Sequence, residues 1–135
     1  MKAIETDVLV IGAGPAGAVA AASLQRDGMR TLVVEKQRFP RFVIGESLLP
    51  HTMDLLKEVG LLEAVEAQGF IHKTGAVFKR GAQVCDFDFM NQSGPGWKYT
   101  YHVPRAEFDK TVADTVAARG VEMLYGTGVT AVKFV

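Results

Sequence analysis

Three closely spaced glycines near the amino end form a pattern that can hold a phosphate group. The pattern G-x-G-x-x-G is filled by Gly12, Ala13, Gly14, Pro15, Ala16 and Gly17. The first glycine permits a sharp strand-to-helix turn, the second leaves room for a pyrophosphate beside the backbone, and the third lets the helix pack closely on the strand. Proline suits the first helical position, because its missing N–H forfeits no hydrogen bond there. The spacing therefore predicts a dinucleotide-binding turn.

An acidic residue follows at the distance that such a turn requires. Glu35 comes 18 residues after Gly17, close to the ~20 at which a carboxylate reaches the ribose of an adenosine. A carboxylate accepts hydrogen bonds from a free ribose hydroxyl and repels a 2′-phosphate. We therefore expect FAD or NAD here and not NADP; the alternative is a tight structural turn without a ligand.

The residues around the glycines predict the elements that position them. The mainly apolar, β-branched run at 7–11 is typical of a strand buried on both faces of a parallel sheet. The alanine-rich stretch after Gly17 predicts a helix that ends at Gly28, and residues 31–34 predict the next strand. The expected fold class is α/β, with a Rossmann-like βαβ unit on a parallel sheet.

Composition excludes several other classes of protein. The chain has 135 residues with 15 basic and 15 acidic side chains, so it carries no electrostatic footprint for nucleic acid. Its single cysteine, Cys85, cannot form an internal disulfide, and no Cys/His cluster has zinc-like spacing, so no metal site is expected. No apolar run reaches the ~20 residues of a transmembrane helix, and the amino end does not read as a signal peptide. We therefore expect a cytoplasmic protein.

The loop after Glu35 separates FAD from NAD. A simple NAD dehydrogenase would continue with a helix and a strand, but a polar loop runs from 36 to about 50 and contains "FPRFVIGESLLP". This segment resembles the FAD-dependent oxidoreductases of the aromatic-hydroxylase and geranylgeranyl-reductase superfamily. Within that superfamily it is similar to the loop of flavin-dependent halogenases that act on pyrrole, phenolic and carrier-tethered substrates. The resemblance implies FAD as the cofactor.

The resemblance also implies which loop residues meet the flavin. The corresponding strip of the halogenases lies against the flavin, which assigns Gly45, Glu46 and Ser47 to the cofactor site. The alternative is that Glu46 and Ser47 only cap the next helix.

Two arginines complete the expected cofactor site. Arg41 is placed to neutralise a pyrophosphate or a flavin edge. Arg105 begins a helix expected at 105–119 and matches an arginine of the superfamily that reaches the FAD phosphates or ribitol; the alternative is a simple helix-start arginine. Lys36 is also expected to contact the cofactor. The backbone of Val129 is expected to contact the adenine.

Lys73 is the expected catalytic residue. The segment "KTGAVF" at 73–78 is similar to the halogenase segment in which an essential lysine is followed by small residues and a phenylalanine. An ammonium group can hold hypochlorous acid by hydrogen bonding, or form a chloramine if burial lowers its pKa. The alternatives are that Lys79 is the matching lysine, or that Lys73 is an exposed residue at the end of a strand.

Alternating apolar and polar residues on either side of the turn at 93–96 predict an antiparallel hairpin. We expect this hairpin to begin a substrate-domain sheet. Its rings either line a pocket for an aromatic substrate or fill a core: Phe87, Phe89, Trp97, Tyr99 and Tyr101.

The expected organisation has three parts. Residues 1–72 form the first part of the FAD-binding domain, 73–103 the inserted hairpin region of a substrate domain, and 104–135 the return to the FAD-binding sheet. In the last part, 121–125 and the tail after it are expected to form two more strands. The chain contains neither the second FAD motif with G-D-A nor a W-x-W-x-I-P signature, so we expect it to be a fragment of a longer enzyme.

These features together predict an FAD-dependent oxidoreductase, foremost a flavin-dependent halogenase. Such an enzyme would use FADH₂ from a separate flavin reductase, oxygen and a halide on an aromatic small molecule, free or tethered to a carrier protein. The alternatives are a monooxygenase or geranylgeranyl-reductase-like enzyme that uses NAD(P)H, and a catalytically inactive FAD-binding module.

Overall fold

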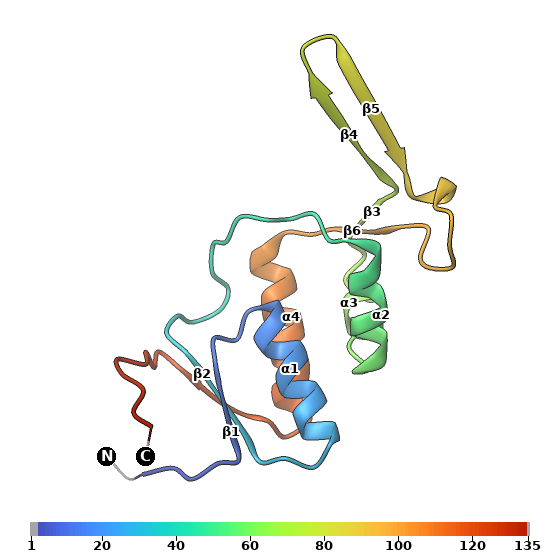
Figure 1. The fold of residues 1–135 in the computed structure, drawn as a ribbon. Helices are drawn as coiled ribbons and strands as arrows, with labels where there is room; N and C mark the ends of the chain where they lie inside the picture. Colours follow the sequence, from blue (N-terminus) through green and yellow to red (C-terminus); the bar gives the residue numbers. More distant parts are fainter. Residues whose placement is uncertain (1–2, 135) are drawn as a thin grey trace.

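A computed structural model describes residues 3–134 and places the glycine pattern at one edge of a parallel sheet (Figure 1). Strands β1 (Val8–Ile11), β2 (Thr31–Glu35) and β7 (Glu122–Tyr125) run parallel in the order β1–β2–β7. All five residues of the central strand β2 are buried. The expected α/β class with a parallel βαβ unit is confirmed.

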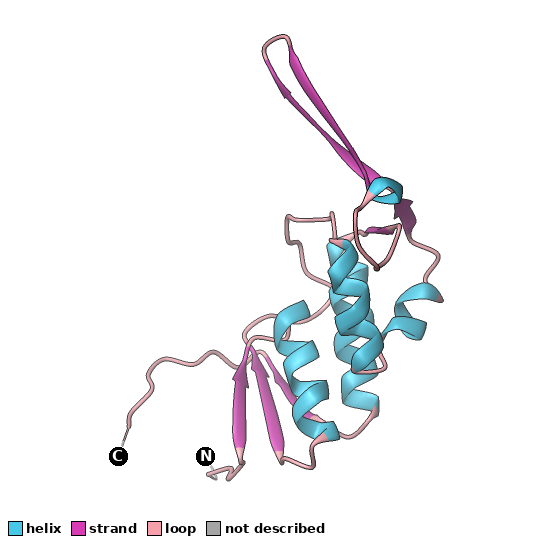
Figure 2. Cartoon of the chain, turned by 45° about the vertical axis from the view of Figure 1, so that its right-hand side comes forward, coloured by secondary structure: helices cyan, strands magenta, loops and turns pink. Residues whose placement is uncertain are grey.

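Two helices cover one face of this sheet (Figure 2). Helix α1 (Pro15–Arg26) packs on β1 and β2 through buried alanines, whose small side chains permit close approach. Helix α4 (Arg105–Ala118) lies against α1 and buries Phe108, Val112 and Val116. The helices α2 (Pro50–Glu58) and α3 (Leu62–Glu66) extend the same core, with α3 in contact with α4.

Strand β1 differs from its expected burial. Leu9 is 46% exposed and Ile11 is 58% exposed, whereas the pattern predicted a strand buried on both faces. The physical reason is that α1 and α4 both lie on the same side of the sheet, so the side chains of β1 that point to the other side have no cover within residues 3–134.

The hairpin predicted around 93–96 is wrong. Strand β5 (Gln83–Asp88) pairs antiparallel with β4 (Gly75–Arg80) instead, and the two project from the body as an arm (Figures 1 and 2). Strand β6 (Thr100–His102) pairs antiparallel with β3 (Ile71–Lys73). Alternation identifies strands but not their partners. Gly81, with φ of 59°, allows a two-residue turn that joins β4 directly to β5.

The expected strand after β7 is also wrong for the residues that the structure describes. Gly126 has φ of 70° and turns the chain out of β7, and residues 127–134 form no helix or strand. The N–H of Thr127 donates to the carbonyl oxygen of Glu35 at 3.0 Å, which holds the start of this tail over the end of β2. Residue 135, the last of the predicted strand, lies outside the described residues.

Within residues 3–134 no helix is long and apolar enough to cross a membrane. In the same range no three His, Cys, Asp or Glu side chains come together in a group that would hold a metal ion.

Candidate functional site

The glycine turn joins β1 to α1 at the carboxyl end of the strand. Gly12 has φ of 99°, a conformation that side chains other than glycine rarely adopt. Gly14 is the N-cap of α1 and provides no side-chain cap, so the first N–H groups of the helix have no side-chain acceptor at this position. A Cβ at Gly17 would overlap the carbonyl oxygen of Gly12. Each glycine therefore meets a steric demand, and the helix start is open to a phosphate.

Glu35 does more than the sequence indicated. Its buried carboxylate accepts hydrogen bonds from the N–H of Ala13 and the N–H of Gln37, both at 2.9 Å. Burial opposes ionisation, but the two N–H donors and the charges of Arg41 and Lys36 outweigh it and lower the pKa of Glu35. The ionised carboxylate thus ties β2 to the glycine turn. Its remaining lone pairs can still accept from a ribose hydroxyl.

A cavity of about 250 Å³ lies beside this carboxylate. It brings together four residues that the sequence assigned to the cofactor from segments far apart in the chain: Gly12, Glu35, Lys36 and Val129. The remaining lining comes from Ile11, Val34, Thr127 and Gly128. The lining combines apolar side chains with the carboxylate of Glu35 and the polar side chains of Lys36 and Thr127, a mixture that suits an adenosine.

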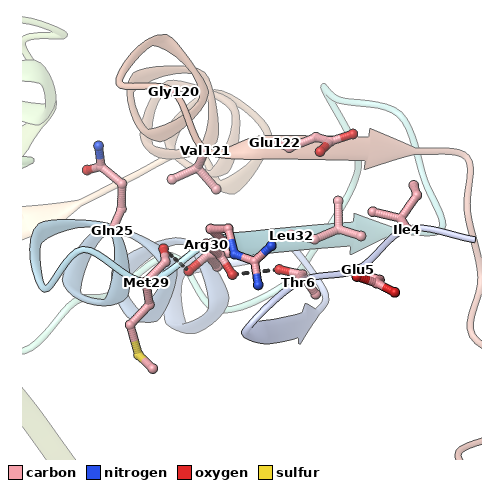
Figure 3. Close-up of a pocket in the computed structure, with 11 residues that line it drawn as sticks. Ile4, Glu5, Thr6, Gln25, Met29, Arg30, Leu32, Gly120, Val121 and Glu122 are labelled. Carbon is pink, nitrogen blue, oxygen red and sulfur yellow. Dashed lines mark hydrogen bonds between the residues drawn. The ribbon is translucent and has the colours of Figure 1, made fainter.

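A second cavity, of about 290 Å³, lies at the opposite end of the strands (Figure 3). Arg30 lines it and is held by Asp7, with its Nη2 at 2.7 Å from Asp7 Oδ1. In open α/β sheets ligands bind at the carboxyl ends of the strands. This cavity lies at the amino end of β2 and is therefore not the candidate site.

Four charged side chains form a nearly buried cluster next to the glycine turn. They are Glu35, Arg41, Arg105 and Asp109. The Arg41 Nη2 lies 3.5 Å from Asp109 Oδ2 and 3.9 Å from Glu35 Oε2. The same nitrogen would lie 3.2 Å from a Cβ on Gly14, so Arg41 lies beside the turn. Its Nε is buried and has no hydrogen-bond partner among the described residues.

Asp109 is a site residue that the sequence analysis missed. Its side chain is 0% exposed, and its two oxygens accept from Arg105 Nε at 2.8 Å and from Arg105 Nη2 at 3.1 Å. The hydrogen bond to Asp109 raises the pKa of Arg105. The i, i+4 spacing of Arg105 and Asp109 was the available signal. It did not reveal that Asp109 also faces Arg41.

The Gly45–Ser47 strip is attached to β6. The N–H of Val103 donates to the carbonyl oxygen of Glu46 at 2.8 Å, and Ser47 Oγ lies 3.2 Å from His102 Nδ1. The carbonyl oxygen of Gly45 accepts from Arg105 Nη1 at 3.3 Å. The hydrogen bonds from its own N–H and from that of Gly45 lower the pKa of Glu46.

The strip does not cap the helix that follows it, as the start of α2 shows. Helix α2 begins at Pro50, its N-cap is Leu49, and no side chain caps it.

Arg105 connects the strip to the charged cluster, and through Arg41 the cluster reaches the glycine turn. The observed donors, the open helix start and the space at Gly14 fit a dinucleotide with a pyrophosphate. Within this group lie the glycines and Glu35, Arg41, Gly45 and Arg105, all of which the sequence assigned to the cofactor.

Lys73 lies apart from this group, at the end of β3 near the base of the projecting arm (Figure 1). It pairs with Thr100 of β6 and is only partly exposed. Its Nζ lies 5.7 Å from the ring centroid of Phe89, which is buried. Lys79, by contrast, is exposed on β4. The structure thus places Lys73 beside an aromatic ring at a junction of elements.

The aromatic residues near Lys73 pack on one another. Tyr101 is 4% exposed, and Tyr99 stacks on His72 with centroids 4.3 Å apart. The Nε1 of Trp97 donates to Asp54 Oδ1 at 2.8 Å. Burial raises the pKa of Tyr101 to about 12. These contacts favour the core interpretation for Tyr101, whereas Phe87 stands 52% exposed on the arm.

Residues 5–134 match the family described as FAD binding domain. A tryptophan 2-halogenase from Chondromyces crocatus is 39% identical over 96% of this chain and 24% of its own length. A 1H-pyrrole-2-carbonyl-[peptidyl-carrier protein] chlorinase from Pseudomonas fluorescens is 34% identical over 95% of this chain and 32% of its own length.

Two solved structures are also similar. A flavoprotein/dehydrogenase from Cytophaga hutchinsonii is 56% identical with a TM-score of 0.91 and covers 96% of this chain and 32% of its own. The flavin-dependent halogenase CmlS is 36% identical with a TM-score of 0.87 and covers 98% of this chain and 24% of its own. The chain therefore spans about a quarter to a third of the length of these relatives.

Proposed function

Because the chain belongs to the FAD binding domain family, we propose that it is the FAD-binding part of a flavin-dependent halogenase. The observation that carries the proposal is the connection of the glycine turn to the Gly45–Ser47 strip through the cluster of Arg41, Asp109 and Arg105. This connection supports the assignment of both segments to one FAD site. Identities of 34–39% to halogenases along nearly the whole chain support the choice of chemistry.

The proposal assigns the following tasks within the site. The helix start at Gly14 and the guanidinium of Arg41 bind the pyrophosphate, Glu35 accepts from the ribose, and the backbone of Val129 meets the adenine. Gly45, Glu46 and Ser47 lie along the flavin. Bound in its reduced form, the flavin would supply, together with O₂, the oxidising chemistry for the halide. Lys73 Nζ then donates hydrogen bonds to the oxidised halogen species and directs it to the substrate.

The proposal extends to partners and to organisation. A separate flavin reductase supplies FADH₂, and the substrate is an aromatic small molecule, free or tethered to a carrier protein, as the names of the tryptophan and pyrrolyl-carrier relatives suggest. Residues 1–72 and 104–135 serve FAD binding, and 73–103 serves the substrate side. The projecting β4–β5 arm falls in that middle segment.

The test uses the full-length protein with FADH₂, oxygen and either chloride or bromide, and pyrrole and phenol substrates in free and carrier-tethered forms. A halide-dependent mass increase of the product supports the proposal. Lys73→Ala is expected to lower halogenation at least ~100-fold while FAD still binds, since a positioned donor contributes on this scale. Lys79→Ala removes an exposed lysine on β4 and is the matched control, which should keep full activity. Equal activity of Lys73→Ala and wild type would refute the assigned role.

The second candidate is a flavoenzyme without halide chemistry, a monooxygenase or reductase that uses NAD(P)H directly. The 56% identity to a protein described as a flavoprotein/dehydrogenase favours it. Rapid NAD(P)H oxidation by the purified full-length protein without any reductase, together with no halogenated product, would select this candidate.

A further inference from the structure

We propose that Asp109 is a positioning residue for FAD binding, which holds Arg41 in front of the glycine turn and Arg105 against the Gly45–Ser47 strip. The inference rests on the FAD-binding part of the proposed function and not on halogenation. It assigns a role to a buried carboxylate on α4 that makes no expected contact with FAD itself.

The burial of Asp109 requires a reason. A carboxylate removed from water is costly unless it is paired and hydrogen-bonded. Asp109 is 0% exposed, and Arg105 engages both of its oxygens, at 2.8 and 3.1 Å. Those two bonds fix the guanidinium of Arg105, whose free Nη1 then donates to the carbonyl oxygens of Gly45 at 3.3 Å and Ile44 at 3.4 Å. The carboxylate thus sets the position of the strip through one arginine.

The second arginine, Arg41, is held to Asp109 by an ion pair. Arg41 belongs to a loop between β2 and α2 that has no regular helix or strand, so its backbone alone does not fix its side chain. Two carboxylates hold its Nη2, and Asp109 is the nearer at 3.5 Å, against 3.9 Å for Glu35. Asp109 is therefore the carboxylate that holds Arg41 beside Gly14.

Positioning and simple electrostatics predict opposite results when the charge of Asp109 is removed. The cluster contains two guanidinium groups and two carboxylates, and a pyrophosphate adds further negative charge. If Asp109 acted only through its charge, its removal would strengthen FAD binding, because a repulsive charge would be lost. If Asp109 positions the arginines, its removal weakens FAD binding despite the gain in positive charge.

The experiment measures the FAD dissociation constant of the full-length apoprotein by flavin fluorescence for Asp109→Asn, Arg41→Gln and the double variant. We expect Asp109→Asn to weaken binding about tenfold, which is about 1.4 kcal/mol. The double variant should lose less affinity than the two single losses multiplied together, because the part of the Asp109 effect that acts through Arg41 is already lost in Arg41→Gln. Thermal unfolding of each apoprotein reports its folding separately.

The matched control is Asp114→Asn, which removes an aspartate from an exposed i, i+4 pair with Lys110 on the same helix. Its FAD affinity should stay within about twofold of wild type, because an exposed pair contributes little. Unchanged or tighter binding by Asp109→Asn, or fully additive losses in the double variant, would overturn the proposal. If Asp109→Asn yields no folded apoprotein, Asp109→Glu replaces it: weaker FAD binding by the folded variant supports the proposal, and wild-type affinity overturns it.

The outcome is separable from that of the proposed function. A protein that binds FAD with the expected dependence on Asp109 but makes no halogenated product refutes the halogenase and leaves the role of Asp109 intact. A protein that halogenates its substrate but whose FAD affinity does not depend on Asp109 refutes the role of Asp109 and leaves the halogenase proposal intact.

Discussion

At the scale of single residues, the same side chain often holds the protein and the cofactor site together. Glu35 is expected at the ribose, yet in the structure its oxygens accept the N–H groups of Ala13 and Gln37. Its negative charge also faces Arg41. A substitution at Glu35 therefore affects the shape of the glycine turn before any ligand is present.

Glu35→Gln tests this double role. The amide keeps the size of the side chain, but only one of its two terminal atoms accepts hydrogen bonds, so one buried N–H loses its partner. We expect the free energy of unfolding to fall by about 1–3 kcal/mol and FAD binding to weaken. Denaturant unfolding of the full-length apoprotein and FAD titration measure the two effects. Glu63→Gln on the exposed side of α3 is the control, and an equal change in both variants would contradict the prediction.

The lowered pKa of Glu35 also predicts an acid dependence. A carboxyl group whose pKa is lower in the folded state stabilises it above the ordinary value of 4.5, and this contribution is lost as the pH falls through the lowered pKa. The apoprotein should therefore lose stability from about pH 5 downward. Melting temperatures as a function of pH should fall less steeply for Glu35→Gln than for wild type, and parallel curves would argue against this assignment.

At the scale of elements, the distance between β1 and α1 is set by the absence of side chains. A Cβ at Gly17 would overlap the Gly12 carbonyl oxygen and lie 3.2 Å from Val10 Cγ1. Alanines 18, 21 and 22, all buried, continue this close approach along α1. The start of the helix, where a phosphate would bind, is therefore fixed by packing along the whole helix.

Gly17→Ala is expected to move α1 away from β1 and to lower both stability and FAD affinity. Alanine is the better helix former, so helix propensity alone predicts a small gain in stability. Overpacking typically costs about 1–3 kcal/mol and should dominate. Thermal unfolding of the full-length protein with and without FAD provides the measurement. Ala20→Ser, on the exposed side of α1, is the control; a Gly17→Ala variant more stable than wild type would refute the packing argument.

At the scale of the whole molecule, a small β3–β6 sheet joins the projecting arm to the helical core. Tyr101 of β6 belongs to that core, and its ring contacts His72 on β3 edge to face. The arm itself is exposed along both strands, apart from the partly buried Gly75 and Ala76 at its base. Cohesion between the body and the arm therefore depends on the aromatic cluster around Tyr101.

Tyr101 predicts an alkaline limit to stability. Burial raises the pKa of Tyr101 from 10.0 to about 12, so the neutral phenol is favoured in the folded protein. This contribution is complete below the unfolded pKa and is lost as the pH rises through the folded one. It amounts to roughly 3 kcal/mol, since one pKa unit corresponds to about 1.4 kcal/mol. Tyr101→Phe should flatten the decline of the melting temperature above about pH 10, and an unchanged decline would contradict this prediction.

The sequence by itself determined the local features. Spacing and periodicity predict, within a few residues, the glycine turn and the elements α1, β2, α4 and β7. They also predict the α/β class and identify Gly12, Gly14, Gly17 and Glu35 as candidate cofactor residues. These features could be predicted because turn geometry and helix packing depend on neighbouring residues, whose physical demands are written in their order along the chain.

The tertiary structure alone decided which distant segments meet. It paired β5 with β4 and β6 with β3, left residues 127–134 without a strand, and brought Asp109 to Arg41. An alternating pattern shows that a strand has a buried and an exposed side, but many strands satisfy the same pattern as partners. In the same way, the charge of Asp109 indicates a need for a cation, and only the packing of α4 against the loop selected Arg41 as well as Arg105.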